Sequence, residues 1–151
     1  MKIELKRILV AIDFSEESRA AMKVGMALAG QVGAALHLLH VLEVIAGAEP
    51  LSRPIEARLA IEATASDELG RMLSPAEQTR FRAALAVEWG SPFDEIIRYA
   101  RSRNIDLITM GTHGRGGVRR LVIGSVAENV VRHASCAVLT VNRTRPELLY
   151  L

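Results

Sequence analysis

The chain has a single cysteine, no stretch that resembles an export signal and no uninterrupted membrane span, and each absence narrows its class. Cys136 has no partner for an intramolecular disulfide, which fits a reducing compartment, and its place inside an apolar run predicts a buried thiol. Near the N-terminus, Glu4, Lys6 and Arg7 interrupt the apolar core that a signal peptide needs. The longest apolar stretch, Val32 to Ala48, contains two histidines and a glutamate. We therefore expect a cytoplasmic protein that does not enter a membrane.

Lysine is scarce, and none occurs between Gly25 and the C-terminus. This excludes the ordinary P-loop, whose Gly-x-x-x-x-Gly-Lys-Ser/Thr motif uses a lysine to reach the phosphates. The dinucleotide fingerprint Gly-x-Gly-x-x-Gly should follow the first strand, where this chain reads Asp13, Phe14, Ser15 and has no glycine before Gly25. A Rossmann-type NAD site is therefore not expected.

Length and composition predict one domain that spans residues 1–151. Half of the residues are hydrophobic, which is enough for a core of ordinary size, and the length leaves no room for a second domain. The formal net charge of +2 comes largely from one arginine cluster and not from a basic face spread along the chain. Nucleic acid is therefore not an expected partner.

Short apolar runs alternate with segments of helical spacing along the whole chain. The runs predict five strands, which are Ile8 to Ile12, Leu36 to Val41, Phe81 to Trp89, Ile105 to Met110 and Cys136 to Val141. Helical spacing and capping residues predict four intervening helices, which begin at Ser15, Ile55, Ser91 and Gly124-Ser125. This alternation predicts an α/β fold, an open parallel sheet with helices on both faces.

Three serines are predicted to be helix N-caps: Ser15, Ser91 and Ser125. The last of them also has capping-box spacing to Glu128. In the first helix, the spacing predicts a buried apolar stripe that consists of Ala20, Val24, Ala27 and Leu28. Two glycines should then end this helix, Gly30 and Gly33.

The stretch from Gly111 to Ser125 combines glycine with unopposed positive charge. It reads Gly-Thr-His-Gly, then nine residues, then Gly-Ser, and no carboxylate occurs between Leu107 and Ala127. Its cations are one histidine and three arginines, His113, Arg115, Arg119 and Arg120. Backbone N–H donors, a helix start and nearby cations are what a phosphate group needs. This stretch is therefore predicted to hold phosphates, with Arg115 and Arg119 among the contacts.

Ligands of open α/β sheets bind beyond the carboxyl ends of the strands, where the strand order reverses. Glu16 and Glu17 at the start of the first helix would repel a phosphate, whereas the helix that begins at Gly124 follows the arginines. The phosphates are therefore assigned to the later helix start. Asp13, which follows the first strand, is left for a neutral group such as a ribose hydroxyl or a base amine.

With these loops, the chain resembles the universal stress protein family, in its ATP-binding subgroup, over nearly its whole length. The resemblance rests on two segments, Ala11 to Ser15 and Asp106 to Gly117, and on the glycine spacing, which matches the motif of that subgroup. It implies an adenine nucleotide α-hydrolase-like fold with strand order 3-2-1-4-5. It also implies a homodimer that pairs through the last strand, Ala137 to Val141.

The same resemblance implies a set of nucleotide-binding residues in three parts. The adenosine half would contact Ala11, Ile12, Asp13 and the backbone of Val41. The ribose and the phosphates would lie against Met110, Gly111, His113 and Gly114. At the following helix start, the phosphates would accept hydrogen bonds from Gly124, Ser125 and Val126.

The expected function is that of an ATP-binding regulatory or signalling module in a stress response, whose nucleotide occupancy biases the conformation of a dimer or the binding of a protein partner. A slow ATPase or phosphotransferase is the second hypothesis, but it needs a positioned base, for which His113 and Asp13 are the candidates. The third is a protein-interaction module that works without nucleotide. AMP and cyclic nucleotides remain open as ligands beside ATP. A divalent metal such as Mg²⁺ would be held through the phosphates, since the histidines lack neighbours at metal-ligand spacing.

Overall fold

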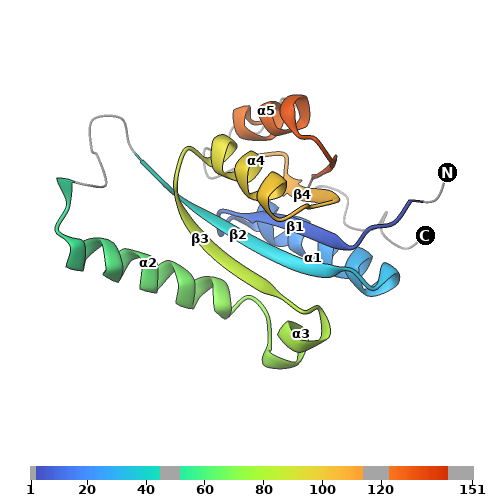
Figure 1. The fold of residues 1–151 in the computed structure, drawn as a ribbon, viewed down its shortest axis with the longest axis horizontal. Coiled ribbons are helices and arrows are strands. Elements are labelled where there is room, and N and C mark those ends of the chain that lie inside the picture. Colours follow the sequence, from blue (N-terminus) through green and yellow to red (C-terminus); the bar gives the residue numbers. More distant parts are fainter. Residues whose placement is uncertain (1–2, 45–51, 114–122, 143–151) are drawn as a thin grey trace.

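A five-stranded parallel sheet forms the centre of the molecule, in a computed structural model that describes residues 3–44, 52–113 and 123–142 (Figure 1). Its strands are β1 (Arg7–Ile12), β2 (Ala35–Glu43), β3 (Ala84–Gly90), β4 (Leu107–Gly111) and β5 (Ala137–Val141). They are ordered β3-β2-β1-β4-β5, and every neighbouring pair is parallel. The predicted fold class and strand order are both confirmed.

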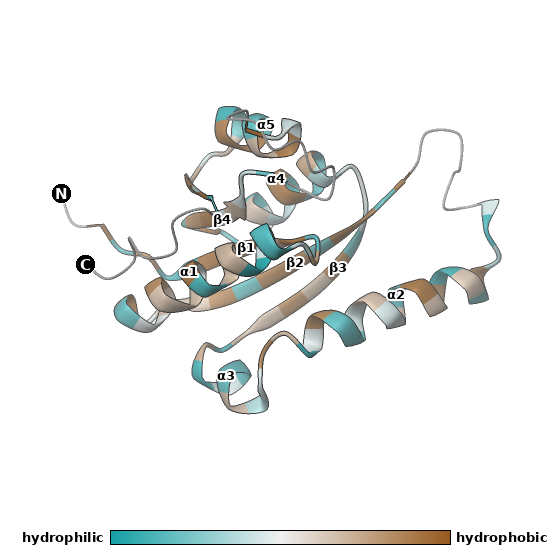
Figure 2. Cartoon of the chain, turned by 180° about the vertical axis from the view of Figure 1, so that it is seen from behind, coloured by the Kyte–Doolittle hydropathy of each residue, from teal (hydrophilic) through white to brown (hydrophobic). Residues whose placement is uncertain are grey.

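Helices cover the two faces of this sheet. They are α1 (Glu16–Val32), α2 (Ile55–Gly70), α3 (Pro75–Arg80), α4 (Pro92–Ser102) and α5 (Ser125–His133). Buried residues of α1 and α2 share one apolar core with the sheet, and those of α4 and α5 share a second core on the opposite face. Accordingly, α1 lies behind the central strands in Figure 1 and in front of them in Figure 2. Within the described ranges, no helix is both long enough and apolar enough to span a bilayer.

The central strands are apolar without interruption because helices cover both of their faces. In β1, the fully buried Ile8 and Val10 face α1, whereas Leu9 faces α4 and α5. The outer strands are less buried, and Leu139 of β5 exposes 37% of its surface. Cys136, next to this edge strand, is half-buried and not fully buried as predicted, although burial still raises the pKa of its thiol.

Helix α1 begins and ends at capping residues. Ser15 is the N-cap, as predicted, and Gly33 adopts the left-handed conformation after the last turn. The prediction that Gly30 ends the helix is wrong, because α1 continues through that residue to Val32. The predicted stripe is also wrong in part, since Ala27 is exposed and Ala21 and Met22 are buried.

The rotation of α1 that buries this face is explained by Gly25. A Cβ at this position would lie 2.8 Å from Cγ2 of Val10 and 3.0 Å from Oγ1 of Thr109. The helix therefore approaches β1 and β4 more closely than a side chain would allow. Contact between α1 and both central strands positions the start of the helix beside the ends of those strands.

Helix α3 was not predicted, and because of it the third strand begins at a later residue than expected. Ser74 and Glu77 form a capping box, in which Glu77 N donates to Ser74 Oγ (3.2 Å) and Ser74 N donates to Glu77 Oε2 (2.8 Å). The six-residue helix occupies the chain up to Arg80, and β3 consequently begins at Ala84 instead of Phe81. Ser91 occupies the predicted N-cap of α4 but its side chain makes no capping hydrogen bond.

Candidate functional site

The candidate site lies where the strand order reverses, between β1 and β4. From β1 the chain proceeds outward to β2 and β3, whereas β4 and β5 lie on the other side of β1. Residues Ile8, Leu9 and Val10 of β1 pair with Leu107, Ile108 and Thr109 of β4. Because the two strands are parallel neighbours, the loops that follow Ile12 and Gly111 leave the same edge of the sheet side by side. The structure therefore brings the two predicted loops together.

The loop after β1 is held by its own side chains. Asp13 Oδ1 accepts hydrogen bonds from the backbone N–H (3.0 Å) and the hydroxyl of Ser15. Ser15 Oγ in turn caps α1 by accepting from Ser18 N (3.2 Å), so Ser15 is the N-cap. The first turn also carries Glu16 and Glu17. This helix start is already capped and is acidic, which makes it a poor place for a phosphate.

At the end of β4, Gly111 lies directly against the first turn of α1. A Cβ at Gly111 would lie 2.8 Å from Cβ of Glu17 and 3.0 Å from its carbonyl carbon. Glycine at this position is therefore required by packing, apart from any role toward a ligand. The preceding Met110 is buried in the core beneath α4 and α5, so its backbone is the part that can face the site.

Thr112 connects three parts of the site. Its N–H donates to the carbonyl of Val141 at the end of β5 (3.1 Å), and its carbonyl accepts from Gly124 N (2.6 Å). Its hydroxyl lies 3.0 Å from Nδ1 of His113. The two ends of the glycine-rich stretch are thus joined to each other and to the last strand. The predicted contacts Gly114, Arg115 and Arg119 lie outside the described residues.

Helix α5 has an open N-terminus, unlike α1. Its N-cap is Gly124, with ψ of 154° and no side-chain capping bond. The prediction that Ser125 caps this helix is wrong, because Ser125 is already its first helical residue and is exposed. The predicted capping box is absent as well, and Glu128 pairs instead with Arg132 (2.8 Å). The hydrogen bond from Gly124 to Thr112 explains the shift, since it holds Gly124 in the extended conformation that an N-cap requires.

The remaining predicted residues line the ends of the central strands. Ala11 and Val41 are partly buried on the face of α4 and α5, where Val126 also packs. Ile12 is buried on the α1 face, and its carbonyl oxygen lies 2.7 Å from Nδ1 of His40. The sequence analysis did not identify His40, because only the strand register brings this side chain to the end of β1.

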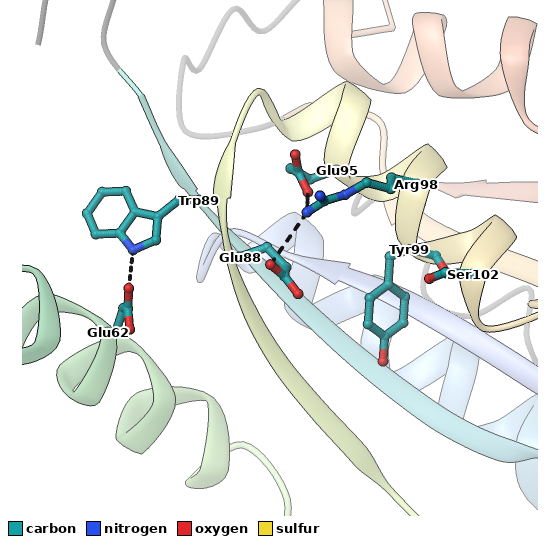
Figure 3. A network of polar contacts seen from close by, with 7 residues as sticks. All are labelled: Glu62, Glu88, Trp89, Glu95, Arg98, Tyr99 and Ser102. Atoms are coloured by element: carbon teal, nitrogen blue, oxygen red, sulfur yellow. Dashed lines mark hydrogen bonds and ion pairs between the residues drawn. The ribbon is translucent and has the colours of Figure 1, made fainter. Parts of the chain in front are cut away.

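A second polar network lies on the outer strand β3 (Figure 3). Arg98 of α4 pairs there with Glu88 and Glu95. On the opposite face of β3, the indole of Trp89 donates to Glu62 of α2. Trp89 therefore attaches α2 to the sheet. These contacts serve helix packing and contain none of the predicted binding residues.

The fold and the loops at its switch point define an open α/β protein of the class that binds ligands at the carboxyl edge of its sheet. The chain belongs to the universal stress protein family, whose model matches residues 4–142. It is similar to two universal stress proteins of Methanocaldococcus jannaschii, MJ0531 (30% identity; 94% of this chain and 85% of that one) and MJ0577 (26%; 95% and 98%).

Solved structures agree with this assignment. The universal stress protein UspA from Lactobacillus plantarum has a TM-score of 0.80 at 28% identity, with 93% of this chain and 99% of that chain covered. The structure of MJ0577 has a TM-score of 0.79 at 29% identity, with 95% and 99% covered. A universal stress protein in complex with cAMP shares the fold, with a TM-score of 0.64 at 20% identity over 92% and 98%. The family predicted from the two loop segments is confirmed.

Proposed function

We propose that this chain binds an adenine nucleotide, ATP in particular, across the ends of β1 and β4, and that nucleotide occupancy regulates its association with a second copy or another protein. The observation that carries the proposal is the contrast between two neighbouring helix starts. The start of α1 is capped and acidic, whereas the start of α5 has no side-chain cap. Only the second is suited to a phosphate chain.

The two halves of the nucleotide would then occupy opposite sides of the switch point. Phosphates at the start of α5 would accept from the backbone N–H groups of Ser125 and Val126, with Gly114, Arg115 and Arg119 preceding them in sequence. Gly124, whose own N–H donates to the carbonyl of Thr112, would line the phosphate site without donating to it. Asp13 on the side of β1 can accept from ribose hydroxyls or a base amine. Ala11, Ile12 and Val41 would surround the adenosine, and Met110, Gly111 and His113 would lie between the two halves.

The fold itself accommodates an adenine nucleotide, because a universal stress protein of this fold has been solved with cAMP. Within the described ranges, no group of three or more His, Cys, Asp and Glu residues could hold a metal ion. A Mg²⁺ ion would therefore enter with the nucleotide, through its phosphates. Hydrolysis would in addition need a positioned base, for which His113 and Asp13 are the candidates.

Regulation through a second copy is supported by the position of β5. This strand has β4 on one side and no described strand on its other side, so its outer backbone groups can pair with another chain. Thr112 links the end of β5 to the ends of the glycine-rich stretch. A ligand that shifts Thr112 would therefore also shift Val141, the last residue of the strand that would form the homodimer interface.

Calorimetric titration with ATP, AMP and cAMP tests the proposal, together with analysis of the nucleotide released when the purified protein is denatured. Ser125→Glu places a carboxylate at the start of α5, where the helix dipole favours it, and should abolish nucleotide binding without lowering stability. Ser91→Glu adds a carboxylate at the N-cap of α4, one position earlier relative to its helix than Ser125, and should leave affinity unchanged.

Two outcomes would reject the proposal: a wild-type protein that binds none of the three nucleotides, or a Ser125→Glu protein that binds ATP as well as wild type does. Sedimentation with and without ATP tests the regulatory part, which fails if the mass distribution and the bound partners are identical in both. Turnover of bound ATP that His113→Ala abolishes would replace the regulatory function with an enzymatic one.

A further inference from the structure

Strand β2 contributes two buried histidines, which point to opposite faces of the sheet. His37 lies on the face of α4, where its Nδ1 is 2.9 Å from the hydroxyl of Tyr99. His40 lies on the face of α1, where its Nδ1 is 2.7 Å from the carbonyl oxygen of Ile12. Both side chains expose 8% of their surface. Only His40 reaches the end of β1, which opens onto the candidate site.

The peptide unit between Ile12 and Asp13 is held at both of its polar groups. Its carbonyl accepts from Nδ1 of His40, which must carry the hydrogen because a carbonyl oxygen cannot donate. Its N–H donates to Oγ of Ser18, a buried residue of α1, at 3.4 Å. A peptide unit is planar, so these two bonds together fix its rotation and thereby the direction in which Asp13 leaves the strand.

Phe14 adds a second contact to the same histidine. Its ring centroid lies 4.5 Å from that of His40 with an interplanar angle of 42°. The backbone of Phe14 has φ of 63°, a left-handed conformation that a bulky side chain rarely adopts without support. The packing of the two rings supports this conformation of the backbone.

We infer that His40 is a positioning residue for the adenosine side of the nucleotide site, acting through the Ile12 carbonyl and the Phe14 ring to hold Asp13 in its binding orientation. The inference rests on the proposed function. His40 itself lies beneath the loop, so it acts through Asp13 without touching the ligand. The N–H group at Nδ1 of His40 is what positions the loop, so another side chain that supplies an N–H at the same place should substitute for histidine.

The test compares His40→Leu with His40→Asn. Leucine keeps much of the volume but has no donor, whereas the amide nitrogen of asparagine occupies the place of Nδ1. We expect His40→Leu to weaken ATP binding about tenfold, the factor that corresponds to one ordinary hydrogen bond, and His40→Asn to recover most of that loss. His37→Leu and His37→Asn are matched controls on the same strand, and both should bind ATP as wild type does.

Hydrogen exchange of the amides of residues 13–15 in the nucleotide-free protein provides an independent readout. Exchange should accelerate in His40→Leu and stay near the wild-type rate in His40→Asn and in both His37 variants. The inference is overturned if His40→Leu leaves both affinity and exchange unchanged, which would show that His40 does not hold the loop. It is equally overturned if His37→Leu alters them to the same extent, which would indicate a merely structural role of both histidines. If wild type binds no nucleotide, the proposed function fails, while the exchange rates still decide whether His40 holds the loop.

Discussion

Replacing Gly111 with alanine tests the contact between the end of β4 and the start of α1. The added methyl group would lie 2.8 Å from Cβ of Glu17 and 3.0 Å from its carbonyl carbon, and one of these is backbone that cannot rotate away. Pairing of Gly111 with Val141 holds β4 in the sheet. The first turn of α1 must therefore move outward, and the capping bonds of Ser15 move with it.

The cost combines overpacking, about 1–3 kcal/mol, with partial loss of the cap, up to about 1 kcal/mol. We expect a loss of about 2 kcal/mol in the free energy of unfolding and, at about 2–4 °C per kcal/mol for a chain of this size, a melting temperature lower by about 4–8 °C. Urea unfolding and calorimetry measure both quantities. Nucleotide affinity should fall as well, because Asp13 and Gly111 would separate.

Gly30→Ala, a glycine substitution within α1, is the control for Gly111→Ala. A Cβ there would lie 3.3 Å from a terminal nitrogen of Arg80, which can move, so the higher helix propensity of alanine should raise stability by about 0.5–1 kcal/mol. Gly111→Ala with an unfolding midpoint equal to that of wild type would refute the reasoning. It would show that α1 does not approach β4 as closely as the structure places it.

Two further predictions concern stability. Burial, together with the charges of Arg103 and Arg7, lowers the pKa of His37 below its ordinary 6.5, so the unfolded chain binds more protons here than the folded chain. Stability should therefore fall as pH decreases through 6.5 toward the folded-state pKa, and His37→Asn should flatten this dependence in urea titrations; an equal slope in both proteins would contradict the assignment. Ser125→Ala should change the free energy of unfolding by less than about 0.5 kcal/mol, because Ser125 is not the N-cap. A loss of about 1 kcal/mol would show that its hydroxyl caps α5 after all.

Local sequence pattern was sufficient for the elements that bury apolar residues. The five apolar runs form the five strands, with first residues displaced by up to three positions, as for β3, which begins at Ala84 instead of Phe81. Helix α3 could not be predicted from the hydrophobic pattern, because none of its residues is buried. Ser74 and Glu77 at capping-box spacing were the available signal for it.

The sequence was sufficient to predict those parts of the candidate site that lie directly at the ends of strands and the starts of helices. Asp13, Gly111 and Gly124 follow from the positions at which strands end and helices begin. The contacts that hold them do not, because they join residues far apart in the chain. His40 reaches Ile12 across 28 positions, and Thr112 meets Val141 only through the pairing of β4 with β5. Ser125 was wrongly predicted to be the N-cap because serine is a favoured N-cap residue. The hydrogen bond from Gly124 to the carbonyl of Thr112 makes Gly124 the N-cap instead.

The hydrogen bond from Gly124 to Thr112 also bears on the entropy of ligand binding. It closes the chain between these two residues into a ring during folding. For a segment of this length, bringing the ends together costs roughly 2 kcal/mol or more in conformational entropy. A ligand that enters later meets ends whose separation is already fixed, so its affinity does not have to overcome that loss. The fold thus supplies part of the preorganisation of the site before any ligand binds.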